Sequence, residues 1–183
     1  MSTIIFHASE YGAGKQYATW VKENVPNATL LDSRLDAVVD FSAFDNIVMI
    51  GSFYWDGLHG AKFMKKHWQE IKDKHVIMAT VGIANPESSD YTRIKKFAFP
   101  DEMIEKMEFY HLRGALDYSK ISWSHRQFLK LMPIFYKKKQ KRLLKEGKGL
   151  DKDAQEFLEN YGGKISYVAR ENVEPIIQSV LEV

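Results

Sequence analysis

The sequence contains no cysteine among its 183 residues. This absence excludes disulfide bonds, thiolate metal sites, iron–sulfur clusters and cysteine nucleophiles. No apolar run approaches the roughly 18 residues that span a bilayer, so we expect no transmembrane helix. The N-terminal apolar stretch is also too short for a secretory signal, which needs roughly 7–15 apolar residues behind a basic start. We therefore expect a cytoplasmic protein.

An excess of charge of one sign is also lacking, because 26 Lys and Arg residues against 24 Asp and Glu residues give a net charge of +2. That total is too small to indicate nucleic-acid binding. The charges are nevertheless unevenly placed, since the stretch from Lys137 to Lys145 holds six basic residues in nine positions. The composition is that of a soluble globular protein, and a chain of this length can bury about 70% of its unfolded surface around one core. We expect residues 1–183 to form a single domain.

Short apolar runs alternate with segments of helical periodicity, which predicts an α/β fold with a doubly wound parallel sheet of five strands and helices on both faces. Continuous apolar runs are typical of parallel strands that are covered on both sides. The predicted strands are residues 4–6, 28–31, 46–51, 76–81 and 109–115. The predicted helices are residues 17–25, 61–71, 151–161 and 173–183, the last with Asn172 as its N-cap.

The segments between these elements complete the prediction. Residues 32–44, 52–60 and 83–101 are predicted as connections, the last a long loop with a turn at Asn85-Pro86. After the fifth strand, residues 116–150 are predicted as an extra helical, basic insertion, and residues 165–168 as a short strand. Ligands of doubly wound sheets bind outside the carboxyl ends of the strands. The candidate site therefore lies in the loops at residues 8–15, 52–60 and 81–91.

The first of these loops, SEYGAGKQ, is a glycine-containing turn between a strand and a helix, which offers backbone N–H groups to a phosphate. A nucleoside-triphosphate loop is excluded by spacing, because Ser9 and Gln16 stand where that motif needs a glycine and a Ser or Thr. A dinucleotide loop is excluded as well, because Tyr17 stands where it needs its third glycine. Two better-known phosphate motifs are thus ruled out.

The loop instead resembles the phosphate loop of flavodoxins, Thr/Ser-x-Thr-Gly-x-Thr, of which Ser9 and Gly12 are kept and Tyr11 and Gly14 are departures. The second loop follows a buried strand with GSFYWDG, where glycines admit a ligand to the backbone and aromatic rings can stack on a flavin. For any single aromatic residue, packing in the core remains the alternative. The third loop offers backbone groups at Val81 and Gly82.

The order of motifs is similar to that of the flavodoxin-domain family, in the branch that includes the bacterial quinone-linked (menaquinone-dependent) protoporphyrinogen oxidase. The resemblance rests on residues 9–15, on residues 47–57 with the helix that follows, on RGALDY at residues 113–118, and on the basic helical segment with Trp123 near its start. It implies a flavodoxin-like sheet of order 2-1-3-4-5 and bound FMN as the cofactor. It also implies an FMN-dependent oxidoreductase acting on a quinone, a porphyrinogen or another small organic substrate.

By the same resemblance, the residues around the FMN phosphate would be Ser9, Tyr11, Gly12, Ala13, Gly14 and Lys15. Those flanking the ring would be Ser52, Phe53, Tyr54, Trp55, Gly57, Val81 and Gly82. No catalytic acid or base is assigned, although His59 and His111 are weighed as proton donors against the commoner structural role of histidine. His67 and His75 lack metal-ligand spacing, and no metal site is expected.

Two questions stay open at the level of sequence. The first is whether the chain is an enzyme or a flavodoxin-like electron carrier or binding module with weak or lost FMN binding. The second is the role of the run from Lys137 to Lys145, for which a solvated helix face, a peripheral contact with an anionic membrane and nucleic-acid binding compete. Nucleic acid is not expected as a partner, because a basic run without a supporting motif is weak support for it.

Overall fold

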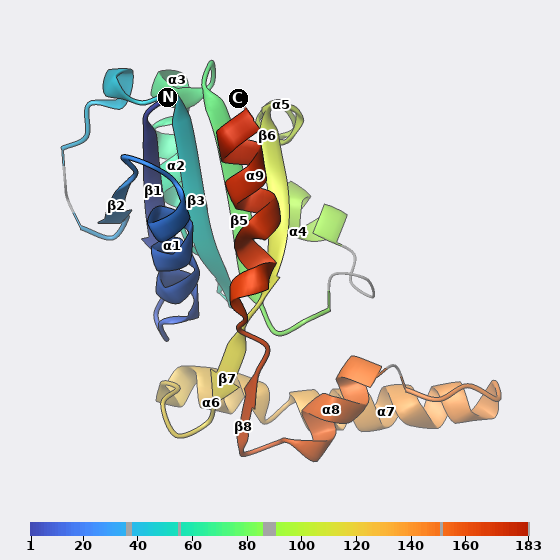
Figure 1. Ribbon diagram of the computed structural model, residues 1–183. Helices are drawn as coiled ribbons and strands as arrows, with labels where there is room; N and C mark the ends of the chain where they lie inside the picture. The colour runs from blue at the N-terminus through green and yellow to red at the C-terminus, as the bar shows by residue number, and fades with distance from the viewer. Residues whose placement is uncertain (36–37, 55, 86–90, 151, 183) are drawn as a thin grey trace. The chain divides into compact units, whose positions relative to one another are not determined.

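The computed structural model describes residues 1–35, 38–54, 56–85, 91–150 and 152–182 (Figure 1). The chain divides into two compact units. One unit combines Met1–Gly114 with Tyr167–Val183, and the other is Ala115–Ser166. That the whole chain is one domain stays a prediction, and the two units are described separately.

The first unit is built on a parallel sheet whose strands lie in the order β2-β1-β3-β5-β6. Its strands are β1 (Thr3–Ala8), β2 (Thr29–Asp32), β3 (Asn46–Tyr54), β5 (His75–Gly82) and β6 (Met107–Arg113). The register places Ile5 beside Val48 and Val48 beside Ile77, so the apolar runs lie side by side across the centre. This confirms the predicted five-stranded sheet and its flavodoxin-like order.

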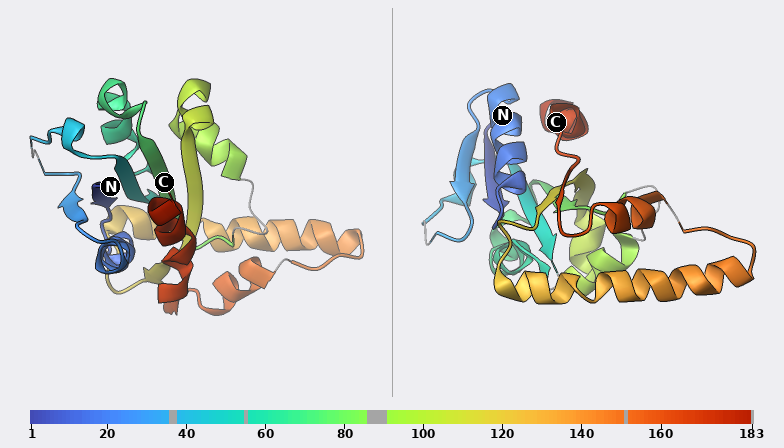
Figure 2. Two further views of the ribbon diagram at one scale, coloured as in Figure 1. Left: turned by 45° about the horizontal axis from the view of Figure 1, so that its top comes forward. Right: turned by 90° about the horizontal axis from the view of Figure 1, so that it is seen from below.

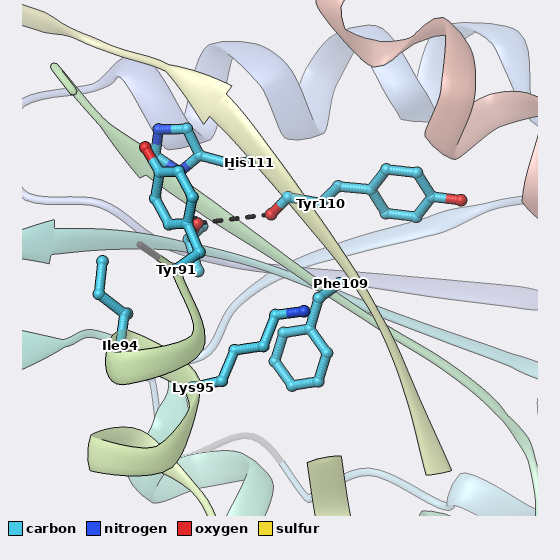
Figure 3. A pocket seen from close by; sticks show the side chains of 7 residues that line it. Tyr91, Ile94, Lys95, Phe109, Tyr110 and His111 are labelled. Atoms are coloured by element: carbon cyan, nitrogen blue, oxygen red, sulfur yellow. Dashed lines mark hydrogen bonds between the residues drawn. The ribbon is translucent and has the colours of Figure 1, made fainter. Parts of the chain in front are cut away.

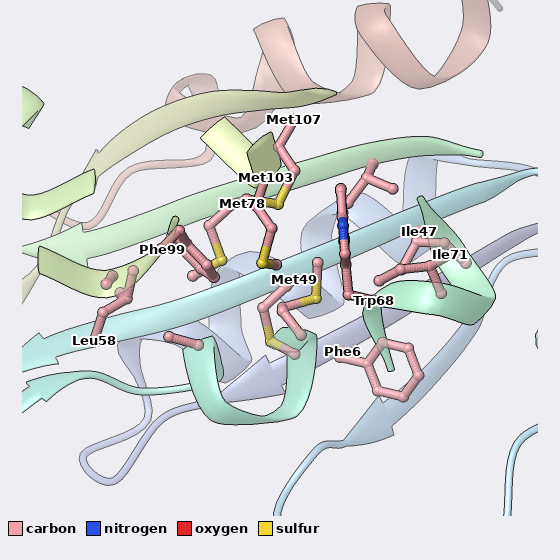
Figure 4. Close-up of a cluster of buried hydrophobic side chains, with 14 of the residues drawn as sticks. Phe6, Ile47, Met49, Leu58, Trp68, Ile71, Met78, Phe99, Met103 and Met107 are labelled. Atoms are coloured by element: carbon pink, nitrogen blue, oxygen red, sulfur yellow. The ribbon is translucent and has the colours of Figure 1, made fainter. Parts of the chain in front are cut away.

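Helices cover both faces of this sheet, which is why its central strands are apolar at consecutive positions. On one face, α1 (Ala13–Asn24) and α9 (Glu174–Glu182) pack against alternate strand residues such as Ile5, Val48 and Ile77 (Figure 2). The other face carries α2 (Ala61–Lys66), α3 (Trp68–Ile71) and α5 (Asp101–Lys106). There a second core of Met49, Met78 and Trp68 fills the space beneath the helices (Figure 4).

Several predicted boundaries were wrong. Residues 83–101 are not one long loop, because α4 (Tyr91–Ala98) lies within them. The helix predicted at residues 61–71 is broken at His67, whose ring packs on Phe41 and Phe63. Asn172 is not the N-cap of α9, because it lies inside the 3-10 helix η2 (Arg170–Val173), where its side chain donates to the Tyr17 hydroxyl.

The loop predicted at residues 52–60 was also wrong, because β3 continues to Tyr54. The short strand β4 (Gly57–Leu58) then pairs antiparallel with it, bringing Phe53 opposite Leu58. Another short 3-10 helix, η1 (Phe41–Ala43), lies in the connection before β3. The candidate ligand edge is thus partly a hairpin with a fixed register.

The second unit contains an antiparallel pair and helices. The pair is β7 (Ala115–Asp117) with β8 (Lys164–Ser166), and the helices are α6 (Trp123–Leu129), α7 (Met132–Lys145) and α8 (Lys152–Glu159). The predicted helical segment therefore opens with a strand, and Ala115, assigned to the fifth strand, belongs to this antiparallel pair. Rings of Tyr136, Phe157, Tyr161 and Tyr118 contact one another in sequence inside the unit. In the described residues, no helix is long and apolar enough to cross a membrane.

Candidate functional site

Backbone N–H groups converge on one oxygen atom where β1 gives way to α1. The hydroxyl of Ser9, a residue only 4% exposed, accepts hydrogen bonds from the N–H groups of Gly12 and Gly14, each at 3.1 Å. The Ser52 hydroxyl at the end of β3 donates to the same oxygen at 3.4 Å. Since these contacts all use Ser9 as the acceptor, its own proton remains available for a ligand.

Glycine is required in this turn for two separate reasons. Gly12 has a φ of +94°, in the left-handed region that side chains disfavour. At Gly14, an added Cβ would stand 3.0 Å from the Ser9 Cβ, closer than side chains normally pack. The turn can therefore close around Ser9 only with these two glycines in place.

The first turn of α1 presents positive charge. It has no acidic residue, and within the described residues the N–H groups of Ala13 and Lys15 have no acceptor. The helix macrodipole adds a partial positive charge at this end, and the Lys15 side chain is exposed beside it. The arrangement suits an anion with several oxygen acceptors, such as a phosphate monoester.

The hairpin of β3 and β4 lies close to this turn through its polar and aromatic residues. The ring of Tyr54 makes edge contacts with Tyr11 at 5.5 Å and with His59 at 4.8 Å between centroids. His59 in turn lies 3.2 Å from the carboxylate of Asp56. Burial raises the pKa of Tyr54, so its hydroxyl stays protonated. Trp55 lies outside the described residues.

Because Gly51 has no side chain, the chain that follows β4 can lie directly against β3. A Cβ at this position would lie 2.0 Å from the carbonyl oxygen of His59, and the N–H of His59 donates to the carbonyl oxygen of Ser52 at 2.9 Å. Phe53 faces the methionine-rich core, whereas Ser52 faces Ser9. The predicted ring-flanking residues of this loop therefore divide between the core and the ligand edge, with Gly57 at the turn at a φ of +123°.

The end of β5 contributes backbone only. The Val81 side chain is 3% exposed and packs in the core beneath α1 and α9. The carbonyl oxygen of Gly82 accepts a 2.7 Å hydrogen bond from the N–H of Gly114. Any ligand contact at this third loop would therefore use main-chain atoms.

His111 on β6 fixes the chain that follows Gly82. Its Nδ1 lies 2.7 Å from the Thr80 hydroxyl and its Nε2 lies 3.1 Å from the carbonyl oxygen of Ala84. Burial lowers the pKa of His111 to about 4, so the ring is neutral at pH 7 and donates from Nε2 to Ala84. The hydroxyl of Tyr91 donates to the same carbonyl oxygen at 3.2 Å. A neutral imidazole held in this way positions a loop and is a poor proton donor.

A cavity of about 190 Å³ opens beside this group between α4 and β6 (Figure 3). The Tyr91 ring covers His111 with centroids 4.0 Å apart, and the Lys95 ammonium lies 4.5 Å from the centre of the Phe109 ring. Thr80 was not predicted as a site residue, and Tyr91 was included only as the end of the third candidate loop. The register that puts Thr80 opposite His111 would have been the signal, but it requires knowing that β5 pairs with β6.

Two further histidines have structural partners. His67 lies 2.7 Å from Glu70, and His75 contacts Asn46 and Glu108. In the part of the chain that the structure describes, no group of His, Asp and Glu residues could hold a metal ion. The groups brought together at the ligand edge are hydroxyls, aromatic rings and backbone N–H groups.

Comparison with known proteins gives one family match. The family described as Flavodoxin domain matches residues 4–142, which is most of the chain and includes all three candidate loops. A comparison with curated proteins finds no match.

Similar solved structures were also found. A flavoprotein in complex with FMN from Lactobacillus acidophilus is 13% identical, with 61% of this chain and 91% of that chain covered and a TM-score of 0.39. A flavodoxin from the domain Archaea is 15% identical, with 62% and 85% covered and a TM-score of 0.42. A mutant flavodoxin from Pseudomonas aeruginosa is 16% identical, with 74% and 96% covered and a TM-score of 0.39. At these TM-scores the likenesses carry no conclusion of their own.

Proposed function

Because this chain belongs to the flavodoxin-domain family, we propose that it binds FMN at the carboxyl edge of its sheet. The phosphate would lie at the turn from Ser9 to Lys15. The ring would lie between the hairpin of β3 and β4 and the backbone that follows β5. Bound FMN would supply reversible transfer of one or two electrons.

The observation that carries the proposal is the convergence of N–H groups on Ser9 at the start of α1. Two N–H groups and the Ser52 hydroxyl polarise the Ser9 hydroxyl, which leaves its proton to donate outward. The N–H groups of Ala13 and Lys15 add donors at the positive end of the helix. These donors fit a phosphate monoester even though Tyr11 and Gly14 replace two hydroxyl residues of the flavodoxin pattern.

The aromatic residues at the hairpin fit the flavin ring. Tyr54, with Tyr11 and His59 at its edges, offers a flat surface beside the phosphate turn. The protonated Tyr54 hydroxyl keeps this surface uncharged at neutral pH. The hydrogen bonds from His111 and Tyr91 to Ala84 fix the backbone on the opposite side.

Titration of the flavin-free protein with FMN and with riboflavin tests the proposal. Tight binding of FMN, quenching of flavin fluorescence and a rise in melting temperature with added FMN are expected. Riboflavin lacks the phosphate, and it should bind more weakly by the worth of at least one hydrogen bond to a charged group, which is about tenfold or more. A protein that remains colourless and gains no thermal stability from FMN would refute the proposal.

We further propose that the flavoprotein is an oxidoreductase that exchanges electrons with a quinone, a porphyrinogen or another small organic molecule. The resemblance of residues 113–118 and of the basic segment to the quinone-linked branch supports this. Oxidation of protoporphyrinogen with menaquinone by the FMN-loaded protein is the test. FMN binding without turnover would favour the alternative of an electron carrier or binding module.

A further inference from the structure

The second unit contains a long segment in which every residue of fixed charge is basic. Residues 118–145 hold nine Lys and Arg residues and no Asp or Glu. Since the whole chain has a net charge of +2, this segment carries +9 and the rest of the chain carries −7. The small total therefore conceals a strong separation of charge.

The helix α7 places four of these nine cations on the side away from its packed face. Tyr136 and Leu143 are partly buried, and Tyr136 contacts the Phe157 ring of α8 at 5.5 Å. Residues three and four positions apart share a helix face. One such row, which we term the outer stripe, runs along the opposite side through Leu131, Ile134, Phe135, Lys138, Lys141, Arg142 and Lys145.

The outer stripe changes character along the helix axis. Its first half is apolar and unusually exposed, with Leu131 at 62%, Ile134 at 66% and Phe135 at 64%. Its second half is cationic, and within the described residues none of these four cations lies within 4.0 Å of a carboxylate. Trp123 at the start of α6 is 76% exposed, and α6 leads directly into α7 (Figure 2). Exposed apolar residues beside these cations indicate a surface that binds a partner or a membrane.

We propose that the outer stripe, with Trp123, docks on an anionic lipid surface. Lysine and arginine near such a surface are attracted to acidic headgroups, while Trp, Phe and aliphatic side chains enter the interface. The apolar and cationic halves of the outer stripe follow one another along the axis of α7. The apolar start of the helix therefore enters the interface, and its cationic end lies among the headgroups.

Other occupants fit less well. A second copy would bring one cationic stripe near another, and the repulsion would oppose a symmetric contact. Nucleic acid would satisfy the cations, but it offers no apolar region for Leu131 and Ile134. An acidic protein has the same deficiency unless it also carries an apolar patch, and the experiment separates these cases.

The test is co-sedimentation of the full chain with phosphatidylcholine vesicles that contain or lack phosphatidylglycerol. Binding to the anionic vesicles that weakens with salt is expected, and the same partitioning is expected with or without FMN, since the docking surface is independent of the proposed flavin site. Replacing Lys138, Lys141 and Arg142 by Gln should lower the partition coefficient by about a hundredfold, at roughly fivefold per cation.

Two further variants make the result specific. Replacing Lys62, Lys65 and Lys66 of α2 by Gln removes the same charge from another exposed helix and should change the partitioning little. Replacing Leu131 and Phe135 by Ser should lower binding at high salt, where the apolar contribution remains. The proposal is overturned if anionic vesicles do not bind at low salt, if both triple variants lose binding equally, or if the stripe binds heparin or RNA while ignoring vesicles.

Discussion

Replacement of Ser9 by Ala separates the role of its hydroxyl in the fold from its role toward a phosphate. In the flavin-free protein, the variant removes the acceptor of the Gly12 and Gly14 N–H groups. The Gly14 bond is buried, so its N–H would be left without a partner, at a cost of about 1–3 kcal/mol. For a chain of this size we expect the melting temperature to fall by roughly 2–10 °C.

The same variant should weaken FMN binding without weakening riboflavin binding. The lost hydrogen bond to a charged phosphate is worth about 1.5–3 kcal/mol, or a tenfold to hundredfold rise in the dissociation constant. The phosphate cannot take over the buried Gly14 N–H, because the void left by one hydroxyl oxygen is too small for it. That penalty is therefore present with and without ligand, and it cancels from the affinity.

Isothermal titration with both flavins measures the difference. Ser42→Ala is the control, since the Ser42 hydroxyl donates to the nearby carboxylate of Asp40 and lies far along the chain from the turn. Equal losses for FMN and riboflavin would show that Ser9 acts only through the fold. An unchanged FMN affinity would refute the placement of the phosphate.

Three further predictions concern stability. Gly51→Ala should destabilise the protein by about 3 kcal/mol or more in a urea titration, because its Cβ would lie 2.0 Å from the carbonyl oxygen of His59. The control Gly149→Ala should leave the stability unchanged, because its Cβ would meet nothing within 4 Å. Burial lowers the pKa of His111 from 6.5 to about 4, so the unfolded chain binds the extra proton and up to about 3 kcal/mol of stability is lost as pH falls from 6.5 to 4; His111→Gln should flatten this part of the stability profile measured by denaturant unfolding. Tyr17→Phe should cost about 1–3 kcal/mol in thermal unfolding, because the Tyr17 hydroxyl donates a 2.6 Å bond to a carbonyl oxygen of β6.

The strands of the sheet could be predicted because burial on both faces leaves a continuous apolar run in the sequence. Residues 46–51 show this most clearly, and they lie at the centre of the sheet. The helix α4 was missed for a different reason. Its apolar residues Tyr91, Ile94 and Ala98 recur at helical spacing, but they follow the turn signal at Asn85-Pro86, and the whole segment was therefore predicted as a loop.

Gly51 misled the prediction for an instructive reason. A glycine after an apolar run usually marks the end of a strand, and the sequence offers no sign of another cause. In the structure β3 passes through Gly51, and the glycine is needed because the His59 carbonyl approaches its Cα closely. The requirement arises from a residue eight positions later, whose approach depends on the hairpin.

Residues that would contact a ligand and residues that hold those contacts in place leave different traces in a sequence. Ser9, Gly12 and Gly14 lie together in one turn, so a local pattern can identify them. His111 acts on Ala84 from a neighbouring strand, and only the pairing of β5 with β6 brings the two together. A local motif search therefore finds the surface of such a site before its support. Substituting His111 should accordingly alter the main chain after Gly82 while the phosphate turn, which is closed by its own hydrogen bonds, keeps its affinity for inorganic phosphate.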